Sequence, residues 1–307
     1  MGSSFASGPG IGHRAPGSPR RARRSAANYP SLLAGWLGLE LTDVTYSGAT
    51  TGDILSRRAD GWPGQLDAVT ADTRLVTMTC GGNDVGYVTR LLLSSLPWPL
   101  AAVAAVRRRA HLLANNELVE ERFAELSSNL MQIAAEVRHR APACRLAFVD
   151  YLTILPPDDT TPTGPLPAEV AEWGRGVAHR LTDVTRKAAG RSGCVFVPVA
   201  DRSAEHHAWS AVPWTRRFQL VPRGGAPYHP NADGMAAVAG LIAGALQPGG
   251  LGAPRPVSAA PRRGVPPERA TPARTTRAPA SSARCAGSGR RPDPCQQPGG
   301  GGSVHRH

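Results

Sequence analysis

The sequence lacks the long apolar runs that membrane-spanning segments and secretory leaders contain. It has no uninterrupted run of roughly 18 or more apolar residues, the length that a transmembrane helix needs. The nearest stretch, 91–106, is broken by two serines and two prolines and is followed by three arginines, a pattern typical of a surface hairpin or lid. Residues 1–24 contain no apolar core of the kind found in signal peptides, which predicts a cytoplasmic protein.

Acidic residues are scarce at both ends of the chain. Residues 1–30 carry five Arg and no acid, and residues 248–307 carry ten Arg and two acids. The intervening residues, 31–247, hold 20 basic and 21 acidic side chains and are nearly neutral. The net charge of +12 therefore belongs to the ends, and it predicts no specific nucleic-acid partner.

Aromatic residues are absent from 248–307, where 11 Pro and 10 Gly occur. Such a stretch cannot bury enough apolar surface to offset the entropy lost on ordering. We therefore expect one folded domain over 1–247 and a disordered Pro/Gly/Arg-rich tail over 248–307. A solvated tail is favoured, and a tether for an anionic partner is the alternative.

Cysteine is rare and has no metal-binding spacing. The five cysteines lie at positions 80, 144, 194, 285 and 295. The first three fall in or beside apolar runs, which favours small buried thiols over disulfides. His206 and His207 are adjacent, but their loop supplies no further ligand, so we expect no metal and no cofactor.

Short apolar runs alternate with longer helical patterns across 31–247. The runs typical of buried parallel strands are Leu41–Tyr46, Arg74–Cys80, Arg145–Tyr151 and Cys194–Val199. Helical patterns occur at Tyr29–Leu37, near Pro63–Val69, across 119–137 and 170–184, and at Ala232–Leu246. This alternation predicts an α/β fold, a three-layer α/β/α sandwich with a mostly parallel sheet. In such a sheet the ligand lies beyond the carboxyl ends of the strands.

Four loops at such positions contain unusual polar and glycine residues. They cover residues 2–10, 46–50, 80–86 and 226–231. Together they supply a small hydroxyl nucleophile, two places where the backbone can approach a ligand, an amide donor and an imidazole base. These are the components of acyl transfer: a serine attacks, a histidine takes its proton, and N–H donors hold the oxyanion.

The motif Gly81-Gly82-Asn83-Asp84 after an apolar strand, with Ser, Gly, Asn and His in that order along the chain, resembles the SGNH hydrolases. This is the GDSL esterase and lipase family, and the likeness to its actinobacterial members extends to about residue 246. The resemblance implies a flavodoxin-like sandwich with five strands and hydrolysis of a small-molecule, lipid or sugar ester. It also implies site residues: the nucleophile Ser4, the base His229, and an oxyanion hole formed by the Ser4 and Gly48 N–H groups and the Asn83 amide.

Each assignment has an ordinary alternative. Ser4 could be an exposed serine, Gly48 could serve only a turn, and Asn83 could only cap a helix. The four residues in order favour the catalytic interpretation. His229 lies in a loop between two prolines, which is more typical of a functional residue than of core packing.

The sequence departs from the family pattern at the triad acid and within the nucleophile motif. Ala226 stands three residues before His229, where the family usually has Asp. We therefore expect a Ser–His dyad in which a carbonyl from Trp209–Ala226 bonds Nδ1 of His229, with Asp233 as a weaker candidate. Ser3 replaces the Asp of the motif and is a nominal rival nucleophile, but the motif places the nucleophile at Ser4.

The family also has a hydrophobic strand before the nucleophile, whereas here Met1 directly precedes Gly2. A sheet without this first, central strand would expose two unpaired edges. We therefore expect either a true start upstream of Met1, which would make secretion possible, or a poorly folded product.

Two functions compete at this point. The first is a serine hydrolase of carboxylic esters, with an acetylated sugar as one variant of the substrate. The second is a catalytically impaired or truncated relative whose basic ends bind anionic surfaces.

Two further segments also have a structural and a functional interpretation. A solvated loop is favoured over an anion-steering role for Arg20–Arg24, and helix packing is favoured over an acyl-pocket lid for 90–116.

Overall fold

The computed structural model describes residues 1–221 and 225–247. The predicted tail, 248–307, lies outside the described residues, and so do Cys285 and Cys295. The domain boundary at residue 247 therefore stays a prediction.

A parallel sheet lies at the centre of the described part. Its strands are β1 (Leu75–Met78), β2 (Arg145–Val149) and β3 (Val195–Val197), in the order β1-β2-β3. Both pairs are parallel, and Leu75 lies opposite Arg145 in the register. Three of the four predicted strand runs are thus confirmed: β1 and β3 are shorter than predicted at both ends, and β2 is shorter at its carboxyl end.

The first residues of the chain occupy the next position in this sheet, beside β1. The backbone nitrogen of Met1 donates to the Thr77 carbonyl at 2.9 Å, and Gly2 forms an isolated parallel bridge with Thr79. The Ser3 N–H donates to the Thr79 carbonyl at 2.9 Å. These residues pair with β1 where the missing central strand was expected, although the segment is too short to count as a strand.

The other side of Gly2 is closed by a side chain. Gln65 accepts from the Gly2 N–H at 2.7 Å and donates to its carbonyl at 3.0 Å, and the Tyr46 N–H also donates to that carbonyl. The run Leu41–Tyr46 lies alongside but is not a strand, so this strand prediction is wrong: the residues it faces are too few for a ladder. Only glycine fits at position 2, because a Cβ would lie 2.5 Å from the Thr79 carbonyl oxygen.

Helices surround the sheet, and the described part contains ten α-helices and three short 3₁₀ helices. They are α1 (Ser4–Ser7), α2 (Tyr29–Leu37), α3 (Thr51–Leu55), α4 (Tyr87–Ser94), α5 (Trp98–Ala101), α6 (Ala104–Ala114), α7 (Asn116–Arg140), α8 (Ala168–Arg191), α9 (Val199–Arg202), α10 (Ala232–Leu246), η1 (Arg20–Ala22), η2 (Gln65–Ala68) and η3 (Ala204–His206). The helices predicted at Tyr29–Leu37 and Ala232–Leu246 are confirmed with the same bounds. The two long ones extend beyond the predicted ranges.

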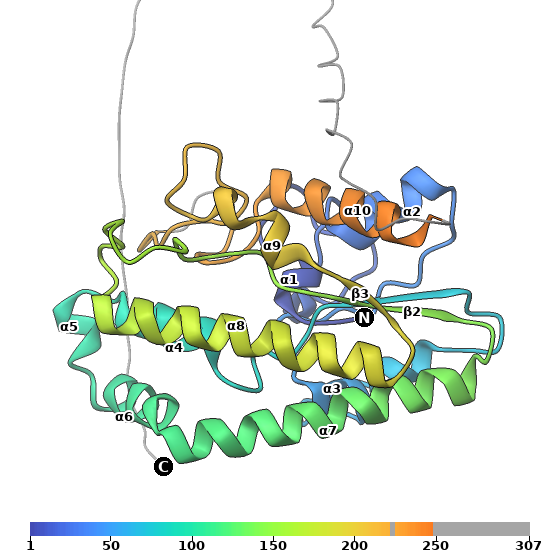
Figure 1. Ribbon diagram of the computed structural model, residues 1–307, viewed down its shortest axis with the longest axis horizontal. Helices are drawn as coiled ribbons and strands as arrows, with labels where there is room; N and C mark the ends of the chain where they lie inside the picture. Colours follow the sequence, from blue (N-terminus) through green and yellow to red (C-terminus); the bar gives the residue numbers. More distant parts are fainter. Residues whose placement is uncertain (222–224, 248–307) are drawn as a thin grey trace, which may run out of the picture. The chain divides into compact units, whose positions relative to one another are not determined.

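The helices form two layers around the sheet. Figure 1 shows α2 and α10 together on one side and α3, α7 and α8 on the other. The apolar side chains of α7 that recur at steps of three and four are all buried: Val119, Phe123, Leu126, Leu130, Ile133 and Val137. The predicted three-layer α/β/α sandwich is confirmed, with three strands and one short paired segment, Met1–Ser3, in place of five full strands.

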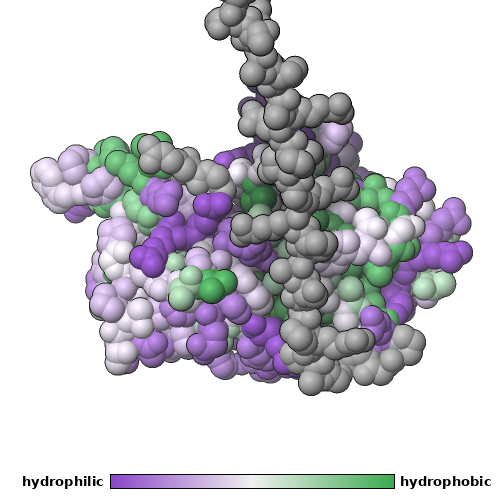
Figure 2. Space-filling view, turned by 90° about the horizontal axis from the view of Figure 1, so that it is seen from above, coloured by the Kyte–Doolittle hydropathy of each residue, from purple (hydrophilic) through white to green (hydrophobic). Residues whose placement is uncertain are grey.

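Apolar side chains also reach the surface of the described part. Figure 2 shows hydrophobic residues gathered in several places on the face seen from above, with hydrophilic residues between them. None of the helices within 1–221 and 225–247 is both long and apolar enough to cross a membrane.

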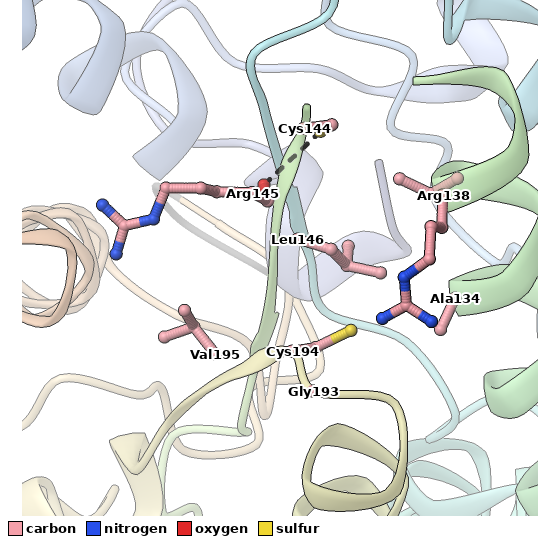
Figure 3. Close-up of a pocket in the computed structure, with 9 residues that line it drawn as sticks. Ala134, Arg138, Cys144, Arg145, Leu146, Gly193, Cys194 and Val195 are labelled. Carbon is pink, nitrogen blue, oxygen red and sulfur yellow. Dashed lines mark hydrogen bonds between the residues drawn. The ribbon is translucent and has the colours of Figure 1, made fainter. Parts of the chain in front are cut away.

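A cavity of about 180 Å³ lies where β2 and β3 begin, at the end of the sheet opposite to the predicted site. Cys144, Cys194 and Arg138 are among the residues that line it (Figure 3). These two cysteines and Cys80 are free thiols; Cys80 is buried as predicted, whereas Cys144 and Cys194 are only partly buried.

Candidate active site

Ser4 opens helix α1 at the carboxyl end of the short segment that pairs with β1. Its side chain is buried, with 8% of its surface exposed. The helix ends after one turn because Gly8 adopts the left-handed conformation, and the Gly8 N–H donates to the Ser4 carbonyl at 3.1 Å. The first N–H groups of a helix have no partner within the helix, so this turn presents backbone donors beside the Ser4 hydroxyl.

His229 lies in the loop before α10 and contacts Ser4 directly. Its Nε2 is 2.8 Å from the Ser4 Oγ, and its Nδ1 is 2.7 Å from the Pro227 carbonyl oxygen. A carbonyl can only accept, so Nδ1 carries the proton and Nε2 is left to accept from the serine hydroxyl. Burial lowers the pKa of His229 to about 4, with a smaller contribution from the charge of Arg23. The imidazole is therefore neutral at pH 7.

The carbonyl that meets Nδ1 differs from the predicted one. It belongs to Pro227, just beyond the predicted range Trp209–Ala226. Ala226 is buried, and its N–H donates to the Pro9 carbonyl at 3.2 Å. Asp233 is exposed in the first turn of α10, so a buried methyl group and a backbone carbonyl occupy the region where the family has its acid.

Tyr228 sets the orientation of that carbonyl. Its φ is +59°, a conformation that is rare for a bulky residue and that determines how the preceding peptide group faces. The side chain is fully buried, and its hydroxyl lies 2.7 Å from the Ser95 hydroxyl at the end of α4. Packing thus holds Tyr228 in a conformation that turns the Pro227 carbonyl toward His229.

The two predicted oxyanion loops lie against each other. Gly48 has a φ of +84° in the turn closed by the bond from the Ala49 N–H to the Tyr46 carbonyl, at 3.0 Å. One N–H of the Asn83 side chain donates to the Ala49 carbonyl at 2.8 Å. An amide has two such donors, so this bond leaves the second available for another acceptor.

The Gly48 loop also contacts the nucleophile helix. Ser7, in α1, has its hydroxyl 2.9 Å from that of Ser47. The four predicted site segments are therefore joined by direct contacts: Ser4 with His229, α1 with the Gly48 loop, and that loop with Asn83.

Asp84 fastens these loops to helix α3. Its carboxylate accepts from the Thr51 N–H at 2.9 Å and also from the Thr51 hydroxyl. Burial raises the pKa of Asp84 to about 6, although the bonds from Thr51 oppose this shift. The residue belongs to the quoted motif, but no pattern in the sequence points to Thr51 as its partner.

Tyr151 is a site neighbour that the sequence interpretation missed. It follows β2, its hydroxyl accepts from the Gly82 N–H at 2.8 Å, and its ring centroid is 4.7 Å from that of Phe5. Burial raises the pKa of its phenol. Its place at the end of the predicted run Arg145–Tyr151, where a ligand is expected, was the signal that could have found it.

The basic run Arg20–Arg24 is only partly solvated. Arg20, Arg21 and Arg23 are exposed, in agreement with the expected solvated loop. For Arg24 the expectation is wrong, because its side chain is buried and its Nε donates to the Thr45 carbonyl at 2.5 Å. That bond ties the run to the chain just before the Gly48 turn.

The two adjacent histidines have structural partners. His206 stacks on Trp214 with ring centroids 3.8 Å apart, and its Nδ1 lies 2.8 Å from the Val212 carbonyl oxygen. His207 accepts from the Trp209 N–H at 3.2 Å. Within the described ranges, no three His, Cys, Asp or Glu side chains are grouped in a way that could hold a metal ion.

A parallel α/β sandwich with a buried Ser–His contact at the carboxyl end of its sheet is the architecture of an ester hydrolase. The sequence model of the GDSL-like lipase/acylhydrolase family matches residues 1–237. The chain belongs to this family and is a carboxylic ester hydrolase, which confirms the resemblance.

Similar proteins occur in Streptomyces. Lipase 2 of Streptomyces coelicolor is 31% identical over 244 residues, covering 76% of this chain and 80% of that protein. A lipase of Streptomyces rimosus is 28% identical over 240 residues, with the same coverage.

Two solved structures share the fold. The extracellular lipase of Streptomyces rimosus superposes with a TM-score of 0.60 at 26% identity, over 80% of this chain and 97% of that one. The phospholipase A1 of Streptomyces albidoflavus NA297 superposes with a TM-score of 0.61 at 23% identity, over 79% of this chain and 95% of that one.

Proposed function

We propose that this protein hydrolyses carboxylic esters through a Ser4–His229 dyad, with the Pro227 carbonyl in place of a triad acid. The observation that carries the proposal is the 2.8 Å contact between His229 Nε2 and Ser4 Oγ, in a histidine whose Nδ1 is already bonded. The distance lies in the range needed for proton transfer from a nucleophile to a base.

The reaction runs in two halves. Ser4 Oγ attacks the ester carbonyl while its proton passes to His229 Nε2, and that proton then leaves with the alcohol as the carbon–oxygen bond breaks. Water next gives its proton to Nε2 and attacks the acyl-serine, and Nε2 returns the proton to Ser4 as the acid departs. In both halves the Pro227 carbonyl accepts from Nδ1–H and stabilises the transient imidazolium.

The oxyanion formed in each half has three donors in the proposal: the Ser4 N–H, the Gly48 N–H and the free N–H of the Asn83 amide. The turn at Gly48 and the bond from Asn83 to Ala49 support this assignment, because both donors are fixed before substrate binds. Preorganised donors of this kind contribute much of the rate in acyl transfer.

The proposed substrate is the acyl ester of a lipid. The relatives in Streptomyces coelicolor and Streptomyces rimosus are named lipases, and one structural neighbour is named a phospholipase A1. An acetylated sugar stays an alternative that no contact in the site favours.

The test is labelling with a fluorophosphonate, followed by peptide mapping and assay of a soluble p-nitrophenyl ester. We expect the label on Ser4 and loss of both label and hydrolysis in Ser4→Ala, with Ser3→Ala as the matched control that keeps the label. A protein with intact circular dichroism that takes no label would refute the dyad and favour the impaired relative with basic ends.

The cellular location stays a prediction. The Streptomyces rimosus relative is named an extracellular lipase, which supports the secreted alternative over the predicted cytoplasmic one. Assay of the culture medium and the cell extract of the native host for the labelled protein separates the two.

A further inference from the structure

Residues 97–112, here named the arch, place apolar side chains in water. The arch contains α5 and most of α6. Trp98 is 81% exposed, Leu100 45% and Val103 49%, and the alanines and prolines around them are mostly exposed as well. Burying these side chains would be favourable, yet no element of the described part covers them.

Both ends of the arch are fixed to the active site. Before it, the Ser95 hydroxyl bonds that of Tyr228, the residue preceding His229. After it, Leu113 is buried against Gly86, at the end of the loop that carries Asn83. Figure 1 shows α4, α5 and α6 gathered at one end of the molecule. The arch therefore extends from the loops that hold the base and the amide donor.

Helix α4 gives this segment a firm base. Arg90 lies over the Trp173 ring of α8 at 4.0 Å, and Leu91 is fully buried. The expected helix packing of 90–116 thus applies to the two ends, whereas the apolar residues of the arch point outward.

The charge of this region has one sign. Residues 87–114 contain four Arg and no Asp or Glu, and Arg107, Arg108 and Arg109 are exposed on α6, just after the apolar residues. A tryptophan and aliphatic side chains beside a cluster of arginines match the two layers of a lipid surface, the acyl boundary and the anionic headgroups.

We propose that the arch is a docking element for the surface of an anionic phospholipid membrane. In the docked state Trp98, Leu100 and Val103 enter the boundary between headgroups and acyl chains, and the three arginines contact the phosphates. Binding itself needs no turnover. Its benefit to catalysis, delivery of an acyl ester to Ser4, rests on the proposed function.

The experiment measures sedimentation of the full chain with vesicles, in physiological salt. Ser4→Ala is the parent, so that the lipids are not consumed. Vesicles of phosphatidylcholine alone are compared with equimolar phosphatidylcholine and phosphatidylglycerol. We expect binding to the anionic vesicles, weakened about tenfold by Trp98→Ala and about tenfold or more by the combined change of Arg107, Arg108 and Arg109 to Gln.

Matched controls change the same residue types elsewhere. Trp36→Ala alters another exposed tryptophan, 52% exposed at the end of α2, and the combined change of Arg14, Arg20 and Arg21 to Gln removes the same charge. Both controls should bind like the parent. Circular dichroism and fluorophosphonate labelling, on versions that retain Ser4, establish that each variant is folded.

The possible outcomes are distinct. Equal binding by the arch variants and the parent overturns the proposal and assigns the binding to the basic ends of the chain. Equal losses in the arch variants and the controls, or equal binding to neutral vesicles, overturn it as well. Failure of the proposed function would instead appear as absence of label on Ser4, with binding unaffected.

Discussion

The two ends of the central sheet differ in what they contain. At the carboxyl end, Ser4, His229 and Asn83 are each held by hydrogen bonds of 2.7–2.8 Å to a neighbouring side chain or carbonyl. At the amino end, a cavity of about 180 Å³ lies among Cys144, Cys194 and their neighbours. The proposed chemistry therefore lies where polar groups are fixed against one another, and the void marks imperfect packing.

The difference has a structural origin. In a parallel sheet the loops that follow the strands converge at one edge, and here they bring together segments that are far apart in the sequence. The loops that precede β2 and β3 hold free thiols, and burial raises the pKa of both Cys144 and Cys194, which leaves them as weak nucleophiles.

Among changes that leave Ser4 and His229 in place, removal of the proposed oxyanion amide should have the largest effect. Asn83→Ala removes one donor to the developing negative charge and also frees the Ala49 carbonyl. We expect kcat/KM for a soluble ester to fall by about 10²–10³-fold while Ser4 still reacts with a fluorophosphonate. A loss below threefold in a folded variant would contradict the proposed donor.

The next effect concerns pH. Because burial holds the pKa of His229 at about 4, the base stays neutral well into mild acid. We expect kcat/KM to hold nearly level from pH 7 to pH 5 and to fall only as the pH approaches 4.

A carboxylate beside the histidine should move the acid limb of this pH profile, the range in which kcat/KM falls as the pH is lowered. Ala226→Asp places a negative charge where the family has its acid, and we expect the acid limb to shift upward by about one unit or more. Ala226→Asn is the neutral control and should leave the limb in place. A limb near pH 6.5 in the parent would show that the burial of His229 does not govern its titration.

The smallest effect is expected at the amino end. Cys194→Ala enlarges the cavity at a half-buried position, so we expect a loss of about 1 kcal/mol in the free energy of unfolding and a change in kcat/KM of less than about twofold. Cys144→Ala truncates the second thiol of the same cavity and should have a similar effect. Urea titration and ester assay provide the two readouts, and a large loss of activity would make the amino end part of the site.

Much of the fold was accessible from the sequence because apolar periodicity is a local signal. The helices at Tyr29–Leu37 and Ala232–Leu246 follow it to the residue, and the first ends where Gly38 takes the left-handed conformation. The run Leu41–Tyr46 failed because a strand needs a partner of similar length, and Met1–Ser3 is too short to supply one.

The candidate site shows the same difference between what a local pattern predicts and what depends on distant contacts. The resemblance to the SGNH hydrolases was enough to nominate Ser4, Gly48, Asn83 and His229, and the structure brings their loops together. The supports were not predictable: Gln65 beside Gly2, Tyr228 in a left-handed conformation, and Asp84 bonded to Thr51 all depend on contacts between distant segments.

The burial of both His229 and Asp84 has a thermodynamic consequence. As the pH falls from 6.5 toward 4, His229 binds a proton in the unfolded chain but not in the folded chain, where its pKa is about 4. This difference favours unfolding. Over nearly the same interval folded Asp84, with a pKa near 6, takes up a proton that the unfolded carboxylate binds only near 3.8, and this favours folding. The two proton uptakes oppose each other. The chain can therefore hold a weakly basic histidine in its interior without that residue making the fold labile in mild acid.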